Sequence, residues 1–391
     1  MDSFYIAWKY IRFNTIKTAI VVACVTLMAF LPIALQLLLG ESERLLLSRA
    51  DSTPLVVGAK GSALDLVMNS LYFGAEIPET MTMAAVTQIQ DSDMAFAIPL
   101  YVRYQARGYA IVGTSLDYFD FRNLQPATGR LLAVLGECVL GATTAKALGL
   151  APGDDLLSAA EHLFDLAGVY PLKMKVVGVL EPAHTADDLA VFVDLKTAWI
   201  IEGLSHGHED LAATQDPSLI IERSDDNITA NAKVFEFTEI NQQNLESFHT
   251  HGDPSSYPIT AAITVPEDDK AATILRGRYL ENTAYQLIHP RTVIEGLLDE
   301  IFRIKNLIDA VVLVVSAATL ATVALVFGLS LRLRRSEIET IFKIGCSRMT
   351  MARFLAAEIF VMLAFSGFFC AVFALVLRHY SQELVRMLVI Q

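Results

Sequence analysis

Three long apolar stretches divide the polar parts of the chain. Thr18 to Gly40, Ala310 to Leu331 and Ile359 to Leu377 contain no charged residue over 23, 22 and 19 positions. A helix needs about 20 apolar residues to cross the hydrocarbon core of a bilayer. The pattern therefore predicts an α-helical membrane protein with about three transmembrane helices.

The first apolar stretch is too long for a typical signal peptide, whose apolar run covers about 7 to 15 residues. We interpret it as an uncleaved anchor in which Pro32 is tolerated or produces a kink. Before it, Phe4, Trp8 and Ile11 share one helical face. This spacing predicts a helix at the inner membrane interface, and a merely polar lead-in is the alternative.

The segment between the first and second spans alternates helix-like and strand-like patterns. PLVVGAK and a helical pattern around residues 64–71 open it, and ITAAITV, a helix at about 268–281 and AYQLIHP close it. We expect these two α/β parts to pack as one subdomain, split by a β-rich insertion at about 113–224. The predicted domains are 1–41 (interfacial helix and first span), 42–300 (external α/β domain) and 301–391 (second and third spans).

Charge orients these parts in the membrane. Residues 1–40 sum to +2 and residues 301–391 to +5, which leaves −20 for residues 41–300 of a chain whose net charge is −13. Short flanks rich in Lys and Arg stay in the cytoplasm, whereas long domains cross largely regardless of charge. We therefore expect a multi-pass membrane protein with its N-terminus inside and its large domain outside. The acidity of that domain argues against binding to nucleic acid.

A short amphipathic helix is predicted directly after the second span, at about 335–346 within LRLRRSEIETIFKIGCSR. Ser336 and Glu339 have the spacing of a capping box, and Gly345 stands where the helix should end. The apolar face consists of Ile338, Ile341 and Phe342. Such a face binds either a groove of a partner protein or the lipid headgroups, and the periodicity alone leaves both open.

The same segment resembles the coupling segment of MacB/FtsX-type (type VII) ABC transporter permeases. IAWKYIRFNTIKTAIVV, GYAIVGTSLDYFDFRNLQPATGR, GECVLGATTAKALGL and MKVVGVLEPAHTADDLAVFVDL resemble further parts of that family in the same order. The resemblance implies a multi-pass protein of a bacterial inner membrane, with a MacB-like periplasmic core domain between the first two spans of an FtsX-like permease. Relatives usually have four spans, whereas 14 residues follow Leu377, so that counting spans puts the C-terminus outside.

The resemblance also implies a function and partners. Such proteins form homodimers or pseudo-dimers, bind a separate ABC ATPase subunit that holds the ATP, and move their periplasmic domains by mechanotransmission to export or extract a substrate. The further partners that the resemblance implies are membrane lipid and a periplasmic adaptor or outer-membrane protein. The residues implied to contact the ATPase are Glu337, Ile338, Ile341, Phe342, Lys343 and Gly345. The alternative is an FtsX-like signal transmitter that regulates a periplasmic cell-wall hydrolase.

Candidate chemistry in the external domain is limited. VVGAKGSAL lacks the Gly-x4-Gly-Lys-Ser/Thr spacing of a phosphate-binding loop, and the chain has neither a Gly-x-Ser-x-Gly nor a His-Glu-x-x-His motif. We therefore expect no enzymatic activity and no intrinsic cofactor. Two His-x-His pairs give one further hypothesis, a zinc site in a metal-linked sensor or transport component. Its ligands would be His206, His208, His249 and His251.

Overall fold

The computed structural model describes the chain apart from residues 1, 160–170, 208–219, 224–227, 231–236, 242, 251, 334, 336–338, 341–342, 344, 346 and 390–391. The chain forms two compact units. The helical unit contains Met1–Arg44 and Leu297–Val389, and the α/β unit contains Leu45–Gly296.

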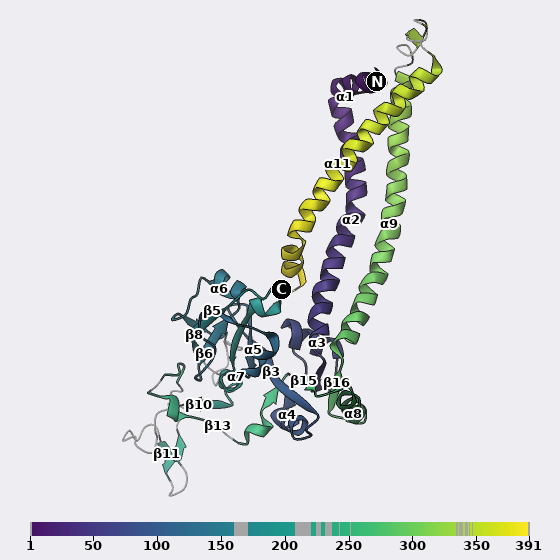
Figure 1. The fold of residues 1–391 in the computed structure, drawn as a ribbon. Helices are drawn as coiled ribbons and strands as arrows, with labels where there is room; N and C mark the ends of the chain where they lie inside the picture. Colours follow the sequence, from purple (N-terminus) through teal and green to yellow (C-terminus); the bar gives the residue numbers. More distant parts are fainter. Residues whose placement is uncertain are drawn as a thin grey trace. The chain divides into compact units, whose positions relative to one another are not determined.

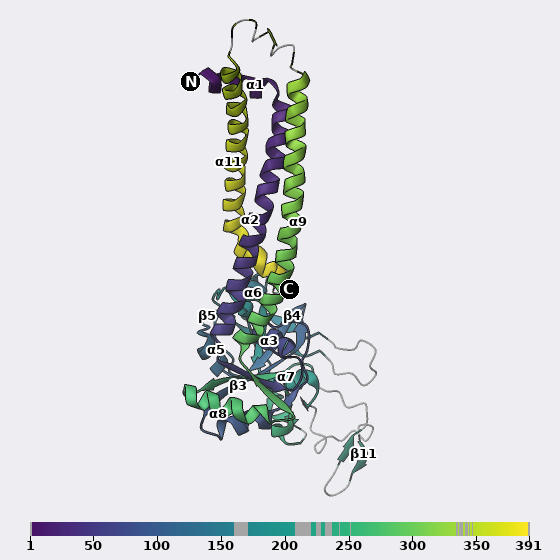
Figure 2. The ribbon, with the colours of Figure 1, turned by 90° about the vertical axis from the view of Figure 1, so that its right-hand side faces the viewer.

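Three long helices form most of the helical unit; their axes are roughly aligned, and the chain runs in α9 opposite to α2 and α11 (Figures 1 and 2). They are α2 (Thr15–Asp51), α9 (Pro290–Leu333) and α11 (Arg348–Val389). Each is long and apolar enough to cross a membrane, over Thr18–Asp51, Pro290–Thr322 and Arg348–Ser381. The prediction of three spans is confirmed for the described residues, and α2 continues through Pro32.

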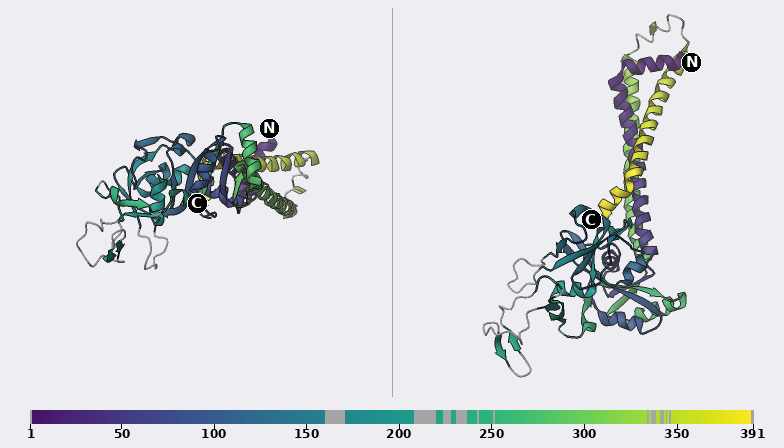
Figure 3. Two further views of the ribbon diagram at one scale, coloured as in Figure 1. Left: turned by 90° about the horizontal axis from the view of Figure 1, so that it is seen from below. Right: turned by 60° about the vertical axis from the view of Figure 1, so that its left-hand side comes forward.

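The predicted N-terminal helix is α1 (Asp2–Phe13), which lies crosswise to the long helices (Figures 1 and 3). Its aromatic side packs on α11, where the rings of Trp8 and Phe365 stack with centroids 5.9 Å apart. Deeper in the unit, the Thr26 hydroxyl donates to the backbone carbonyl of Ser366 at 3.4 Å. The Ser366 hydroxyl donates to the carbonyls of Val22 and Met362, at 3.3 and 3.0 Å. Hydrogen bonds between side chain and backbone therefore join α2 to α11.

Helix α2 is longer than the apolar stretch that predicted it. It passes Gly40 and ends only at Asp51, through the sequence ESERLLLSRAD. These residues are mostly good helix formers, and Glu41 pairs with Arg44 one turn later. Pro54 then stops the helix, because proline disfavours helical backbone in the residue before it.

The α/β unit is built on one ten-stranded sheet in the order β16-β1-β15-β3-β4-β9-β6-β8-β5, with β7 paired to β8. The strands are β1 (Leu55–Ala59), β3 (Ala95–Ala106), β4 (Tyr109–Thr114), β5 (Pro126–Gly129), β6 (Glu137–Leu140), β7 (Asp155–Leu157), β8 (Lys173–Leu180), β9 (Ala190–Asp194), β15 (Ala261–Pro266) and β16 (Tyr285–Ile288). Two-stranded pairs are formed by β2 (Met81–Thr82) with β14 (Pro258–Ile259), β10 (Ser205–Gly207) with β13 (Phe248–Thr250), and β11 (Ile220–Arg223) with β12 (Ile228–Ala230).

The two predicted α/β parts share one half of this sheet. β1 lies between β15 and β16, and β15 pairs with β3, all in antiparallel register. Strands from both ends of the segment therefore interleave. The β-rich part supplies the other half, β9, β6, β8, β5 and β7, and the parallel pair β4–β9 joins the halves. The predicted fold class, an α/β domain split by a β-rich insertion, is confirmed.

Short helices complete the α/β unit. They are α3 (Ala63–Tyr72), α4 (Met83–Gln90), α5 (Asp117–Arg122), α6 (Ala142–Leu148), α7 (Leu195–Glu202) and α8 (Asp269–Leu280), with 3-10 turns η1 (Ala186–Leu189), η3 (Leu245–Ser247) and η4 (Pro254–Ser256). The Ser62 hydroxyl caps α3 by accepting from the backbone N–H of Asp65. Helix α8 packs on β15 and β16 (Figure 1).

Candidate functional site: a buried polar cluster at the end of α2

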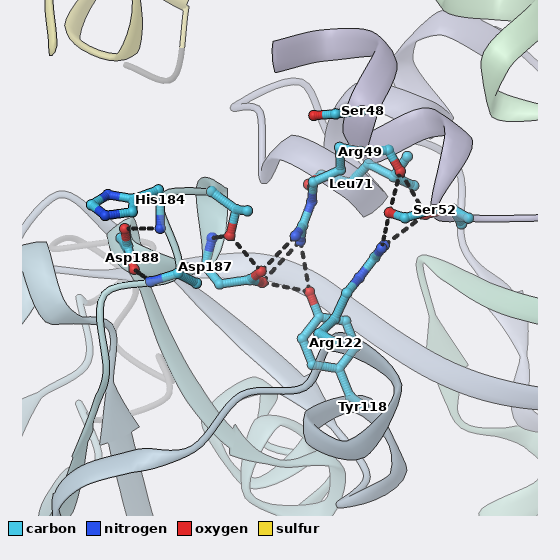
Figure 4. A network of polar contacts seen from close by, with 12 residues as sticks. Ser48, Arg49, Ser52, Leu71, Tyr118, Arg122, His184, Asp187 and Asp188 are labelled. Carbon is cyan, nitrogen blue, oxygen red and sulfur yellow. Dashed lines mark hydrogen bonds and ion pairs between the residues drawn. The ribbon is translucent and has the colours of Figure 1, made fainter. Parts of the chain in front are cut away.

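Arg49, in the last turn of α2, lies at the centre of a buried polar cluster (Figure 4). Only 6% of Arg49 is exposed. Its Nε donates to the carbonyl of Leu71 at 2.6 Å, and its Nη1 and Nη2 donate to the two carboxylate oxygens of Asp187 at 2.5 and 2.8 Å. A bidentate pair of this kind fixes the orientation of both partners as well as their distance.

Asp187 comes from η1, the turn that leads into β9. It is 1% exposed and also accepts from the Thr185 hydroxyl at 2.8 Å. Burial opposes ionisation of this carboxyl. The charge of Arg49 and the hydrogen bonds from Arg49 and Tyr118 outweigh burial and hold the pKa of Asp187 below its ordinary value. The pair is therefore ionised at neutral pH.

Helix α5 contributes two further members. The Tyr118 hydroxyl accepts from Nη2 of Arg49 at 2.8 Å and donates to Asp187 at 2.7 Å, and burial raises the pKa of Tyr118 to about 12. The Arg122 guanidinium donates to the hydroxyls of Ser52 and Thr53, at 2.9 and 2.7 Å. Both hydroxyls donate in turn to the carbonyl of Arg49. The end of α2 is thus capped from α5.

Aromatic side chains pack around this cluster. The ring of Phe192, in β9, contacts Phe73, Tyr118 and Phe119 with centroids 6.2, 5.6 and 5.3 Å apart. The Arg49 guanidinium lies 5.7 Å from the centroid of Phe73. Because apolar rings keep water away, the charges in the cluster interact in a low effective dielectric.

A close approach of backbones holds η1 in place. A Cβ at Gly141 would lie 2.2 Å from the carbonyl oxygen of Asp187, so that only glycine fits there without displacement. The N–H of Gly141 donates to the carbonyl of Ala190 at 2.9 Å. The residue that starts α6 therefore rests directly on the turn that carries Asp187.

We define the Arg49 cluster as Arg49, Ser52, Thr53, Leu71, Tyr118, Arg122, Thr185 and Asp187. Its hydrogen bonds join four elements: the end of α2, α3, α5 and η1. The two charges of its central pair are held by each other and by neighbouring polar groups. The cluster therefore joins these four elements of the α/β unit.

The predicted ATPase-coupling residues are only partly within the described chain. Glu337, Ile338, Ile341 and Phe342 lie outside the described residues, so their predicted role stays a prediction. Glu339 and Lys343 are helical and exposed, and Glu339 pairs with Arg335 at 3.2 Å. Gly345 lies in a turn with φ of +99°, a conformation that favours glycine at the end of a helix.

Two of the four predicted zinc ligands are paired through their backbones. The antiparallel register of β10 and β13 sets His206 opposite His249. The Nδ1 of His249 donates to the carbonyl of Ser247 at 2.9 Å. His208 and His251 lie outside the described residues, and the described residues contain no group of three or more potential metal ligands.

Sequence reasoning did not identify the Arg49 cluster. Tyr118, Arg122 and Asp187 lie within segments that carry the family resemblance, but nothing in those segments indicates that they meet Arg49. The available signal was a lone arginine after the apolar triplet Leu45–Leu47 in a helix-forming segment. Its partner Asp187 lies 138 positions away, which no local pattern can reveal.

Comparison with known proteins gives the family. Residues 18–240 match the model of the MacB-like periplasmic core domain, and the chain belongs to this family, which is of the ABC transporter permease type. No curated protein matched the sequence.

The solved structures that resemble the chain include one periplasmic region, one extracellular domain and one domain of a permease protein. The periplasmic region of MacB from Actinobacillus actinomycetemcomitans is 10% identical, with 63% of this chain and 92% of that chain covered and a TM-score of 0.33. The extracellular domain of the noncanonic ABC-type transporter YknZ from Gram-positive bacteria is 13% identical, covering 60% and 98%, with a TM-score of 0.32. A domain of a putative permease protein from Porphyromonas gingivalis is 10% identical, covering 60% and 88%, with a TM-score of 0.28.

Proposed function

We propose that this member of the MacB-like periplasmic core domain family is the membrane subunit of an ABC transporter in a bacterial inner membrane. A separate ATPase subunit binds and hydrolyses ATP, and the chain, acting as a homodimer, converts this into movement of its periplasmic α/β unit. The movement drives export or extraction of a periplasmic or membrane substrate by mechanotransmission. A periplasmic adaptor or outer-membrane protein is the partner expected to receive the substrate.

The observation that carries this proposal is the continuity of α2. This single helix begins as a membrane span and ends inside the α/β unit, where the Arg49 cluster holds its last turn. A helix is stiff along its axis, because every turn is closed by backbone hydrogen bonds. A displacement of the span therefore has a direct route to the periplasmic unit, as a mechanical transmitter requires.

The cytoplasmic side offers a contact for the ATPase. Lys343 and Glu339 are exposed on the segment that follows α9, and α11 begins a few residues later, with the Ser347 hydroxyl accepting from the N–H of Thr350. Because this segment connects α9 to α11, a bound partner that displaces the segment also displaces both membrane helices. The predicted apolar residues Ile338, Ile341 and Phe342 would form the docking face.

Affinity purification of the full-length protein from its native host in mild detergent, with mass spectrometry of the partners, tests the proposal. We expect a soluble ABC ATPase together with an adaptor or a substrate protein. Recovery of the ATPase with a cell-wall hydrolase instead would favour the FtsX-like signal transmitter. Recovery without any ATPase would contradict the transporter assignment.

The pairing of β10 with β13 favours a second candidate function, zinc binding. A metal bound to His249 through Nε2 would leave Nδ1 to donate to the carbonyl of Ser247, as in many metal-bound histidines. The register also sets His206 opposite His249. We expect zinc in the purified protein, measured by mass spectrometry, and its loss in the double variant His206→Ala/His249→Ala. Equal zinc content in the variant would contradict the site.

A further inference from the structure

Helix α2 is fixed at two separate places. Within the helical unit, Thr26 and Val22 share hydrogen bonds with Ser366 of α11. Within the α/β unit, Arg49 holds Asp187 and Leu71. Both contacts are made by one continuous helix, α2.

We infer that the Arg49–Asp187 pair is the joint through which a displacement of α2 is passed to the inserted, β-rich half of the periplasmic unit. The inference rests on the proposed function and names the positioning residues that its movement requires. Arg49 is the member on the moving helix, and Asp187 is the member on the receiving half.

The geometry of the pair suits this role. Two parallel hydrogen bonds resist rotation as well as separation, because both would have to lengthen together. The pair is buried, so water cannot easily replace either partner as the elements move. By contrast, the pair between Asp51 and Arg291, also at the end of α2, is about half exposed on both sides. Water screens that contact, and it can break and re-form at little cost.

Asp187 is placed to pass a displacement onward. Three residues after it the chain enters β9, which pairs with β4 on one side and with β6 on the other. Its carbonyl also lies against Gly141 at the start of α6. A shift of η1 must therefore move β9 and α6, since the close packing around Gly141 leaves no room for η1 to move alone.

Arg49 also contacts the other half of the sheet, the half that contains β15 and β3, through Leu71 of α3. Its carbonyl accepts from Nε of Arg49, and the neighbouring Tyr72 hydroxyl donates to the carbonyl of Leu46 at 2.5 Å. Helix α3 packs on β15 and β3. Arg49 thus bridges the two halves of the sheet. A rotation of α2 therefore changes the force on the parallel strand pair β4–β9, which joins these halves.

Hydrogen exchange of the full-length protein with its co-purified ATPase in lipid nanodiscs tests the joint. Exchange is compared without nucleotide and with ATP held by a hydrolysis-deficient ATPase, in the wild type, in Asp187→Asn and in the matched control Asp51→Asn. Asparagine keeps the shape of aspartate and removes its charge. ATP hydrolysis by the complexes with active ATPase is measured in parallel.

In the wild type and in Asp51→Asn we expect ATP to change exchange both at the end of α2 and over residues 186–194. In Asp187→Asn we expect hydrolysis and the change at the end of α2 to persist, while the change over residues 186–194 is lost. An unaltered ATP response over residues 186–194 would overturn the joint and leave the transporter function standing. Failure of the wild type to hydrolyse ATP or to respond to it would overturn both.

A milder variant covers the case in which Asp187→Asn does not fold. Tyr118→Phe removes the hydroxyl that bridges Arg49 and Asp187 and keeps both charges. We expect it to fold and to reduce the ATP response over residues 186–194 while hydrolysis continues. A full response in this folded variant would count against the joint.

Discussion

Removal of the Asp187 side chain tests how strongly the Arg49 cluster stabilises the α/β unit. The variant Asp187→Ala leaves the guanidinium of Arg49 buried without its ionic partner and takes two hydrogen bonds from it. Removing one partner of a buried ion pair costs about 3 to 5 kcal/mol. Domains are stable by about 5 to 15 kcal/mol, so the loss is a large share of the total.

The expected size can be measured as a melting temperature. One kcal/mol shifts the melting temperature of a domain of about 150 to 250 residues by about 2 to 4 °C. Asp187→Ala should therefore lower it by about 6 to 20 °C. The probe is the fluorescence of Trp199, which is 4% exposed and donates to the carbonyl of Pro258 at 2.8 Å. Trp8→Phe as the background removes the other tryptophan of the chain.

The control is Asp51→Ala, which breaks the exposed pair with Arg291 close to the same helix end. Because solvent screens this pair, its loss should change the melting temperature far less. Equal shifts in the two variants, or no shift in Asp187→Ala, would refute the assignment of a buried stabilising pair. Both outcomes are measured on the full-length protein in one detergent, so that the membrane helices contribute equally.

Three further predictions follow from the same geometry and from the coupling segment. Because folding lowers the pKa of Asp187, the ionised carboxylate stabilises the fold above the unfolded pKa of about 3.9, and this stabilisation is lost as pH falls through the folded pKa. The difference in melting temperature between the wild type and Asp187→Asn should therefore shrink towards pH 3. A constant difference would contradict an ionised pair. In a urea titration, Gly141→Ala should destabilise the α/β unit by about 1 to 3 kcal/mol, because the added methyl group overpacks against η1. The control Gly277→Ala, on the open side of α8, should be neutral or stabilising. Phe342→Asp should abolish co-purification of the ATPase while membrane insertion persists, because it puts a charge on the predicted docking face, and unchanged co-purification would remove that assignment.

Much of the architecture can be predicted from the sequence because its causes are local. Apolar runs of membrane-spanning length predict spans wherever they occur. Strand and helix periodicities around Leu55–Ala59, Ala63–Tyr72 and Asp269–Leu280 appear in the structure as β1, α3 and α8. The interleaving of β1 between β15 and β16 was expected only as a general packing of the two α/β parts. Its register depends on contacts between distant segments.

The membrane class, the α/β character and the order of the segments can thus be predicted from local patterns. Which polar groups meet depends on the folded arrangement of distant segments. No local pattern singles out Arg49, yet folding brings Asp187 and Tyr118 to it from 138 and 69 positions away. Likewise, His206 and His249 belong to segments far apart in the sequence, and only the register of β10 and β13 sets them opposite each other. A charge can be buried only beside a partner, and the fold as a whole supplies that partner.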